Sequence, residues 1–442
     1  MEQKDERAQR ANNEHSRPGG YAGAERKRGA GMSAVLTEKP ATAPVSDLVN
    51  TYVGRVRSGD MGALPSVLAL IILSCVFWAA RPVFMSEANF ANLFTQGAAI
   101  AVIAMGLIFV LLLGEIDLSA GFTSGVCAAV LAVLLTDRGW PWYAAVVVSL
   151  LTGVLIGLTI GTIVVKVGIP SFVVTLAAFL ALQGVALKIM DNGRNISIRD
   201  DTILAVANKN VPPLLGWLLY AVLVAGFAFV QYRKLRARTK LGLTGETAPV
   251  IVARIVAVAV VLGIAVLVLN GERSRNPELH SLKGMPIVVP LIAILLLVWT
   301  FVLNRTSFGR HIYAVGGNAE AARRAGITVD RVKITAFVLC STMAAVGGLI
   351  AASRANSVDP NTGGSSVLLL AVGAAVIGGT SLFGGRGRML DAVLGAAVVA
   401  VIDNGMGLMG YSAGTKFVVT GFVLLLAAGV DALSRKRTLL RR

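Results

Sequence analysis

The chain has 442 residues, of which 55% are hydrophobic and 15% charged, and its mean hydropathy of +0.73 excludes an ordinary soluble globular domain. Its 41 Lys and Arg against 24 Asp and Glu give a formal net charge of +17, which would suit nucleic-acid binding if the basic residues were clustered on a soluble surface. They are spread between apolar segments instead, so the composition predicts a polytopic membrane protein without a nucleic-acid partner.

The N-terminal residues 1–62 are rich in Gly, Ala, Arg and Glu and have no apolar run before Ala63. Such a segment buries too little surface to fold alone, so we predict a disordered cytoplasmic tail. It also lacks the apolar core of a signal peptide, and the first spanning helix is expected to act as the insertion signal. Residues 63–433 are predicted to form the transmembrane domain, and residues 434–442 a basic cytoplasmic tail.

Twelve segments are apolar over close to the roughly 20 residues that a helix needs to cross a hydrocarbon core of about 30 Å. The predicted fold class is all-α, a polytopic transmembrane helical bundle with about 10–12 spanning helices, because several segments are short enough to be broken, tilted or re-entrant. The segments are residues 63–81, 97–113, 119–136, 143–165, 172–190, 212–231, 249–269, 286–304, 334–353, 366–383, 388–409 and 415–433.

The positions of the basic residues predict the orientation. With the N-terminus in the cytoplasm, the inside segments hold 29 Lys and Arg and the outside loops hold 11. Without residues 1–62 the inside segments still hold 19. Cytoplasmic loops carry the excess of basic residues, so both termini are predicted to be cytoplasmic.

Two glycines bracket a polar stretch, Gly114-Glu-Ile-Asp-Leu-Ser-Ala-Gly121, between the second and third apolar segments. Irregular backbone at membrane depth occurs only where it is buried in protein or lines a water-filled route. Glu115, Asp117 and Ser119 are therefore candidates for a translocation path. The alternative interpretation is a tight polar turn at the cytoplasmic surface with a structural Asx cap.

Other polar or charged residues lie inside the apolar segments. A neutral polyol would be held by hydroxyl, amide and aromatic groups, and Ser171, Thr175, Gln183 and Asn404 could supply such contacts or bond helix to helix. Several further positions are expected to be structural. Asp391 and Asp403 should bond locally or to Arg386 and Arg388, and Arg254 should extend its side chain to the membrane interface. Close helix contacts are expected at Gly153, Gly157 and Gly161, and side-chain packing at Cys75, Cys127 and Cys340.

A polar island, residues 309–333, lies between two apolar segments and is predicted to carry a short helix on the cytoplasmic side. Asn318 is a good N-cap, and Glu320 lies in the first turn, where the helix dipole favours an anion. Gly326 can take the left-handed position after the helix. The last turn holds Arg323 and Arg324. This arrangement predicts a docking element for a partner.

The chain has no sequence signature of an enzyme or a resident cofactor. Gly405-Met-Gly-Leu-Met-Gly410 matches a dinucleotide-binding pattern but ends an apolar helix, and Gly410-Tyr-Ser-Ala-Gly-Thr-Lys416 lacks the spacing of a phosphate-binding loop. The three histidines have no metal-ligand spacing. We therefore predict no catalytic residue, no metal and no cofactor.

Four segments resemble the permease subunits of bacterial sugar ABC importers of the ribose and xylose type. The match extends from about residue 65 to 432, and the extra spans from about 212 to 269 resemble the xylose-type branch. The segments are Gly114-Glu-Ile-Asp-Leu-Ser-Ala-Gly121, Gly168-Ile-Pro-Ser-Phe-Val-Val-Thr-Leu176, Gly316-Gly-Asn-Ala-Glu-Ala-Ala-Arg-Arg-Ala-Gly-Ile327 and Gly378-Gly-Thr-Ser-Leu-Phe-Gly-Gly-Arg-Gly387.

The resemblance implies a multi-pass permease of the bacterial inner membrane that imports a monosaccharide, xylose or a related pentose, by alternating access. Its implied partners are a separate ABC ATPase subunit, a periplasmic or lipid-anchored sugar-binding protein, a second permease copy in a homodimer, and membrane lipid. The family's coupling motif carries over to Asn318, Glu320, Ala321, Ala322, Arg323 and Gly326.

Two other classes of membrane protein remain as alternatives. A proton-coupled secondary sugar transporter would suit twelve spans and buried carboxylates, but it should show two related halves, and the sequence shows no clear repeat. A channel would need a repeated filter-like loop, which the sequence lacks.

Overall fold

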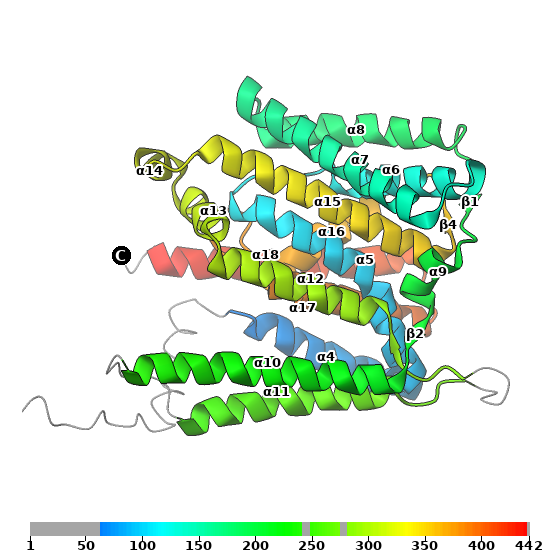
Figure 1. The fold of residues 1–442 in the computed structure, drawn as a ribbon, viewed down its shortest axis with the longest axis vertical. Helices are drawn as coiled ribbons and strands as arrows, with labels where there is room; N and C mark the ends of the chain where they lie inside the picture. The colour runs from blue at the N-terminus through cyan, green and yellow to red at the C-terminus, as the bar shows by residue number, and fades with distance from the viewer. Residues whose placement is uncertain (1–61, 241–247, 275–280, 440–442) are drawn as a thin grey trace, which may run out of the picture. The chain divides into compact units, whose positions relative to one another are not determined.

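A computed structural model describes residues 62–240, 248–274 and 281–439. The predicted tail over residues 1–62 lies outside the described part except for Gly62, as do residues 440–442 of the predicted basic tail. The described part is mostly helical and has only two short strand pairs, which confirms the predicted all-α class (Figure 1). The helices are α4 (Leu64–Ala80), η1 (Pro82–Met85), α5 (Glu87–Leu112), α6 (Ala120–Ala132), η2 (Val133–Asp137), α7 (Trp142–Thr162), η3 (Ile163–Val167), α8 (Ser171–Ile189), α9 (Asp201–Asn208), α10 (Pro213–Lys240), α11 (Ala248–Leu269), α12 (Val288–Arg305), α13 (Ser307–Gly317), α14 (Ala319–Arg324), α15 (Val329–Ala355), α16 (Ser365–Gly378), α17 (Met389–Leu408) and α18 (Ala413–Leu439).

Each of the twelve predicted apolar segments corresponds to one helix. Within the described residues, nine helices are long and apolar enough to cross a membrane, while α4, α16 and the apolar part of α18 are shorter. The largest difference from the prediction is at α5, which begins at Glu87 rather than at residue 97. The Ser86 hydroxyl caps this helix, and Asn89 is buried against another helix instead of facing lipid.

The described chain forms two compact units. One holds residues 227–240 and 248–255, which are parts of α10 and α11, and in it the Arg233 guanidinium lies 5.9 Å from the centre of the Phe229 ring. The other unit holds the remaining described residues. All contacts described below lie within this second unit.

The core of the larger unit is built around α5 and α15, which contact each other. Glycines let α7 approach α15 closely: a Cβ at Gly157 would lie 2.6 Å from the Phe337 carbonyl oxygen, and one at Gly153 would lie 2.8 Å from that of Ser341. The predicted packing role of the small residues in residues 153–161 is therefore confirmed.

The same order of elements occurs twice in the larger unit. A long helix, an irregular segment, a short helix and a further helix form α5–α6–α7 and again α15–α16–α17. The helix α7 packs on α15, and α17 packs on α5. The short helices meet inside the unit, because a Cβ at Gly121 in α6 would lie 2.7 Å from the carbonyl oxygen of Gly363, just before α16. The sequence did not reveal this repeat, since it lies in the arrangement of the helices.

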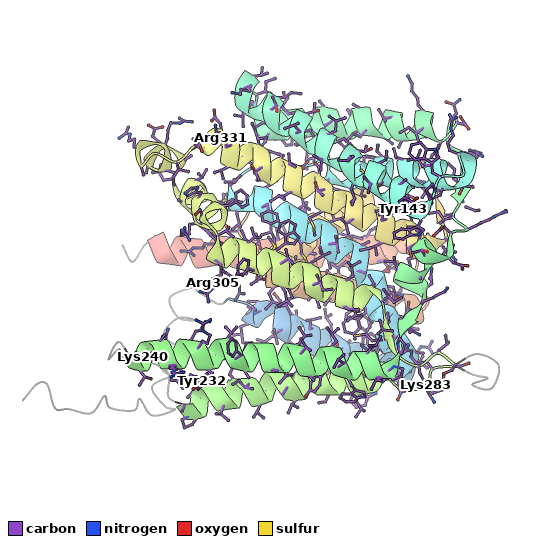
Figure 2. The ribbon with its side chains drawn as sticks, in the orientation of Figure 1. Tyr143, Tyr232, Lys240, Lys283, Arg305 and Arg331 are labelled. Carbon is purple, nitrogen blue, oxygen red and sulfur yellow. The ribbon has the colours of Figure 1, made fainter. Side chains whose placement is uncertain are left out.

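Two ends of the bundle can be told apart in Figure 2, where Arg305 and Arg331 lie at one end and Tyr143 and Lys283 at the other. The first end carries α13 and α14 and is called the α14 end. The second carries two antiparallel strand pairs, β1 (Ile196–Ser197) with β4 (Ser357–Val358) and β2 (Asn210–Val211) with β3 (Met285–Pro286), and is called the strand end.

Candidate functional site

The polar island forms the capped helix that the sequence predicted. Asn318 has an extended backbone at the N-cap of α14, and its Oδ1 accepts a hydrogen bond from the Ala321 amide at 2.9 Å. Gly326 lies in the left-handed region at φ +84°. Glu320 pairs with Arg323 at 3.4 Å and with Arg324 at 3.3 Å on the exposed side.

The six residues of the predicted coupling motif separate into two groups in space. Ala322 is buried and belongs to the hydrophobic core, so it holds α14 against the bundle. The other five are exposed and leave one face of α14 open for a partner: Asn318, Glu320, Ala321, Arg323 and Gly326.

The segment after α5 turns back into the bundle. Gly114 has φ +74°, and Glu115 forms an ion pair with Lys333 in the first turns of α15. Asp117 is 1% exposed and neighbours the Cys340 thiol, seven residues farther along α15, which corresponds to roughly 10 Å of helix. The segment therefore enters the interior from the α14 end.

The Asp117 carboxylate closes an Asx turn. Its Oδ1 accepts hydrogen bonds from the Ser119 amide at 2.9 Å and from the Ser119 hydroxyl at 2.6 Å. The hydrogen bonds are those of the structural Asx cap that the sequence left as the alternative interpretation. The burial of Asp117, however, is that expected of a segment at membrane depth. The role of Asp117 in transport stays a prediction.

Two further candidates from α8 hold the same segment. The Ile116 amide donates to the Ser171 hydroxyl at 3.3 Å, and the Thr175 hydroxyl donates to the Ile116 carbonyl at 3.2 Å. Both α8 side chains are buried. The first turn of α8 is thus attached to the backbone that leads to Asp117.

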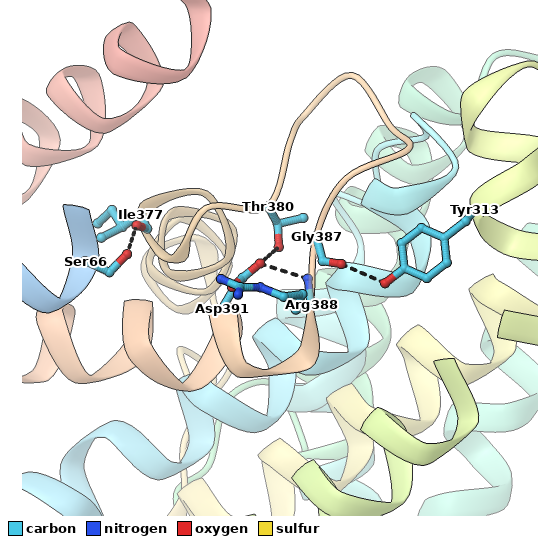
Figure 3. A network of polar contacts seen from close by, with 7 residues as sticks. All are labelled: Ser66, Tyr313, Ile377, Thr380, Gly387, Arg388 and Asp391. Carbon is cyan, nitrogen blue, oxygen red and sulfur yellow. Dashed lines mark hydrogen bonds and ion pairs between the residues drawn. The ribbon is translucent and has the colours of Figure 1, made fainter. Parts of the chain in front are cut away.

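The fourth sequence segment is the glycine-rich loop between α16 and α17. The Gly385 amide donates to the Leu112 carbonyl, the end of α5, at 2.8 Å. In Figure 3 the Tyr313 hydroxyl of α13 donates to the Gly387 carbonyl, a contact of 2.7 Å. Burial raises the pKa of Tyr313, so this phenol remains a hydrogen-bond donor.

Asp391 closes the loop from the α17 side. Its carboxylate accepts from the Arg388 amide at 2.8 Å and from the Arg388 guanidinium at 2.8 and 3.1 Å, with the Thr380 hydroxyl at 3.4 Å (Figure 3). The predicted local bonding of Asp391 to Arg388 is confirmed.

All four segments therefore meet at the α14 end. We call this meeting point the motif junction and define it by residues 114–119, Ser171, Thr175, Gly316, Lys333, Gly384 and Gly385. The structure brings together five of the seven predicted path residues there: Glu115, Asp117, Ser119, Ser171 and Thr175.

The other two predicted path residues lie apart from the junction. Gln183 is exposed on α8, twelve residues beyond Ser171. Asn404 is buried on α17, where its amide exchanges two hydrogen bonds of 2.9 Å with the amide of Asn89. Asn404 would have to leave this pair to contact a sugar.

The predicted interaction of Asp403 was wrong. Asp403 pairs with Lys416 at 3.0 Å rather than with Arg386 or Arg388. It lies twelve residues beyond Asp391 in α17, roughly 18 Å toward the strand end, where α18 begins.

Sequence reasoning missed three residues that the structure places at key contacts. Lys333 pairs with Glu115, Tyr313 bonds the glycine-rich loop, and Asn89 pairs with Asn404. Lys333 and Tyr313 belong to the polar island, which was the available signal. Asn89 had none, because its partner is 315 residues away.

The junction offers hydrogen bonds and fixed charges rather than reactive groups. Within residues 62–240, 248–274 and 281–439, no three His, Cys, Asp or Glu side chains group as metal ligands. Its chemistry suits positioning of backbone segments and contact with polar solutes.

Comparison with known proteins gives a family match. Residues 89–428 match the family described as "Branched-chain amino acid transport system / permease component". No solved structure matches the chain.

The curated relatives are sugar-transport proteins. The chain is 35% identical over 384 residues to a xylose transport system permease protein of Escherichia coli (strain K12), covering 87% of this chain and 95% of that protein. It is 30% identical over 384 residues to the xylose permease of Haemophilus influenzae, at 87% and 99% coverage. It is 28% identical over 370 residues to a ribose import permease of Escherichia coli (strain K12), at 83% and 92%.

Proposed function

The chain belongs to the family of transport-system permease components that its residues 89–428 match, and we propose that within this family it imports xylose or a related pentose. It is the transmembrane permease subunit of a sugar ABC importer, and the similarity to xylose permeases over 87% of the chain is the observation that carries the choice of sugar. The proton-coupled carrier is not favoured, although the repeated order of helices would also suit such a protein.

The chain is a transport component rather than an enzyme, and ATP hydrolysis takes place on a separate subunit. As a permease subunit of this family, it works with an ATPase and with a substrate-binding protein. It is a multi-pass protein of the inner membrane.

The ATPase subunit is proposed to dock on α14. Its exposed face carries Glu320 between Asn318 and the basic residues Arg323 and Arg324. The N-cap at Asn318 and the left-handed Gly326 support the proposal, because they hold a six-residue helix whose length alone would not keep it folded.

The translocation path is proposed to use Glu115, Asp117, Ser119, Ser171, Thr175 and Gln183, with Asn404 only if its pair with Asn89 opens. Five of these gather at the motif junction, and Gln183 supplies an exposed amide on the same helix as Ser171. Hydroxyl and amide groups suit a neutral sugar, since they exchange hydrogen bonds without a net charge.

The domain organisation and assembly also belong to the proposal. Residues 1–62 form a cytoplasmic tail, residues 63–433 the permease domain and residues 434–442 a basic cytoplasmic tail, and α14 lies in the cytoplasm. The permease acts as a homodimer. The exposed apolar residues of α7 are proposed to contact lipid: Val147, Leu151, Leu155 and Leu158.

The test is purification of the tagged chain from native membranes in mild detergent, followed by identification of partners and reconstituted xylose uptake. We expect a soluble ATPase to be recovered with the wild type and lost on Glu320→Lys. The matched control is Asp201→Lys on α9 at the strand end, which should keep the ATPase. A chain that purifies alone and takes up sugar on a proton gradient would contradict the proposal.

The path has its own test. Asp117→Ala should lower uptake while the ATPase subunit still co-purifies, because Asp117 is 1% exposed and is not part of the exposed face of α14. Undiminished uptake by this variant would assign the Asp117 turn a structural role only.

A further inference from the structure

Backbone, rather than side chains, forms the closest contact between α13 and the segment after α5. A Cβ at Gly316 would overlap the Leu112 carbonyl oxygen and lie 3.0 Å from the Gly385 amide. A Cβ at Gly384 would lie 2.9 Å from the Gly114 amide and 3.0 Å from the Gly316 carbonyl oxygen. Three chain segments therefore touch at glycines, and such a close-packed contact transmits displacement because protein interiors have low compressibility.

A second contact joins the other side of α14 to the same segment. The helix α14 continues through residues 325–328 into α15, whose Lys333 pairs with Glu115. The two side chains are 25% and 18% exposed, so water screens the pair only in part. Glu115 lies two residues before Asp117, so the ion pair attaches α15 next to the Asp117 turn.

The segment is also bonded to α8. Ile116, between Glu115 and Asp117, bonds Ser171 through its amide and Thr175 through its carbonyl. Much of α8 beyond this first turn is exposed on the unit, so the helix has few packed neighbours that would resist a shift of its first turn.

We propose that α13, α14, the first turns of α15 and residues 114–119 move as one body, held by the Gly316–Gly384–Gly114 contact and the Lys333–Glu115 ion pair, and that this body carries movement of α14 to the first turn of α8. The inference rests on the proposed function, since it takes the ATPase to be the source of the movement. Lys333, Glu115, Gly316 and Gly384 are positioning residues that act through the backbone of residues 114–119.

The ion pair is tested by reversing its charges. Glu115→Lys and Lys333→Glu should each lower sugar-stimulated ATP hydrolysis and uptake by about tenfold while the ATPase subunit still co-purifies, within the range of coupling energies of contacting residues. The double variant should recover to within about threefold of the wild type, because the swapped charges attract again. Wild-type coupling in the single variants, or no recovery in the double variant, would overturn the inference.

The glycine contact is tested with two neighbouring positions. Gly316→Ala adds a methyl group where the Leu112 carbonyl lies, whereas Gly317→Ala adds one with nothing within 4 Å. We expect Gly316→Ala to keep the bound ATPase and lose stimulation, and Gly317→Ala to match the wild type. Equal stimulation in both variants would count against the glycine contact. If Gly316→Ala does not fold, the inference is tested by the Glu115→Lys and Lys333→Glu variants alone.

Hydrogen exchange on the purified permease separates this inference from the proposed function. The amides of Ile116 and Ser119 should exchange faster in Glu115→Lys and return toward wild-type rates in the double variant, with no ATPase present. Unchanged exchange in all variants would refute the rigid body. By contrast, a wild-type chain that binds no ATPase would refute the proposed function and leave the exchange result standing.

Discussion

Two aspartates on α17 show which buried polar groups the fold depends on. The Asp391 carboxylate is 2% exposed and accepts from the amide and guanidinium of Arg388. Asp403 on the same helix is 57% exposed and pairs with Lys416. The two aspartates look equivalent in the sequence, but burial makes the first one structural.

This contrast gives a stability prediction. Asp391→Ala leaves the Arg388 amide and the Thr380 hydroxyl without their acceptor, and it should lower the free energy of unfolding by about 2–4 kcal/mol. Asp403→Ala removes an exposed pair and should cost less than about 1 kcal/mol. Thermal unfolding of the two variants in the same detergent checks the order, and equal losses would contradict it.

At the scale of elements, short segments owe their conformation to caps and turns rather than to length. The helix α14 has only six residues and is held by the Asn318 cap and by Gly326 at φ +84°. At the strand end, the Glu272 carboxylate accepts from the Ser281 hydroxyl and from the amides of Ser274 and Leu282, and so joins the two described ends of the segment that we call the Glu272 loop.

The left-handed residue after α14 predicts a coupling defect. Gly326→Val should cost about 1–2 kcal/mol locally, because a β-branched residue disfavours positive φ, although nothing lies within 4 Å of the added Cβ. We expect insertion to be normal and uptake to fall several-fold. Gly326→Asn, which tolerates the left-handed region, is the control and should keep most uptake.

The Glu272 loop predicts a defined pH range. The Ser281 hydroxyl, the two amides and Lys283 lower the pKa of Glu272 from 4.5 to about 2. A lowered pKa in the folded state means that the stabilisation is complete above pH 4.5 and is lost as the pH falls toward 2. The Ser274 and Leu282 amides should therefore be equally protected at pH 7 and pH 5, after correction for intrinsic exchange rates.

The control for this loop is Glu272→Gln, which should weaken the protection of both amides at pH 7. If protection in the wild type were already lost between pH 7 and pH 5, a different group would have to hold the loop.

At the scale of the whole molecule, the short helices α13 and α14 and the two strand pairs define two ends of the larger unit. Arg305 and Arg331 lie at the α14 end, and the strand pairs lie at the other end. The distribution of Lys and Arg in the sequence predicts that the α14 end faces the cytoplasm.

Sidedness can be measured with single cysteines in a chain whose three native cysteines are replaced. Arg323→Cys on α14 should react with a membrane-impermeant thiol reagent only from the cytoplasmic side. Ser197→Cys in β1 should react only from the outside. Labelling of Arg323→Cys in intact cells would contradict the prediction that α14 lies in the cytoplasm.

The sequence by itself determined the class of protein and the approximate positions of the long apolar helices. Apolar segments of bilayer length predict spanning helices directly, because the backbone must bond internally in lipid. The cap of α14 was also readable, since Asn318 and Gly326 act within a few residues of the helix that they end. The resemblance of four motifs to sugar permeases pointed to the family that the comparisons confirmed.

Only the tertiary structure decided which of these residues meet. The Lys333–Glu115 pair joins residues 218 apart, and the Asn89–Asn404 pair joins residues 315 apart. The contact of Gly316 with Leu112 and the repeated order around α5 and α15 likewise depend on how the helices pack. Local patterns carry no information on such contacts, because lipid-facing and protein-facing helices are equally apolar and only packing distinguishes them.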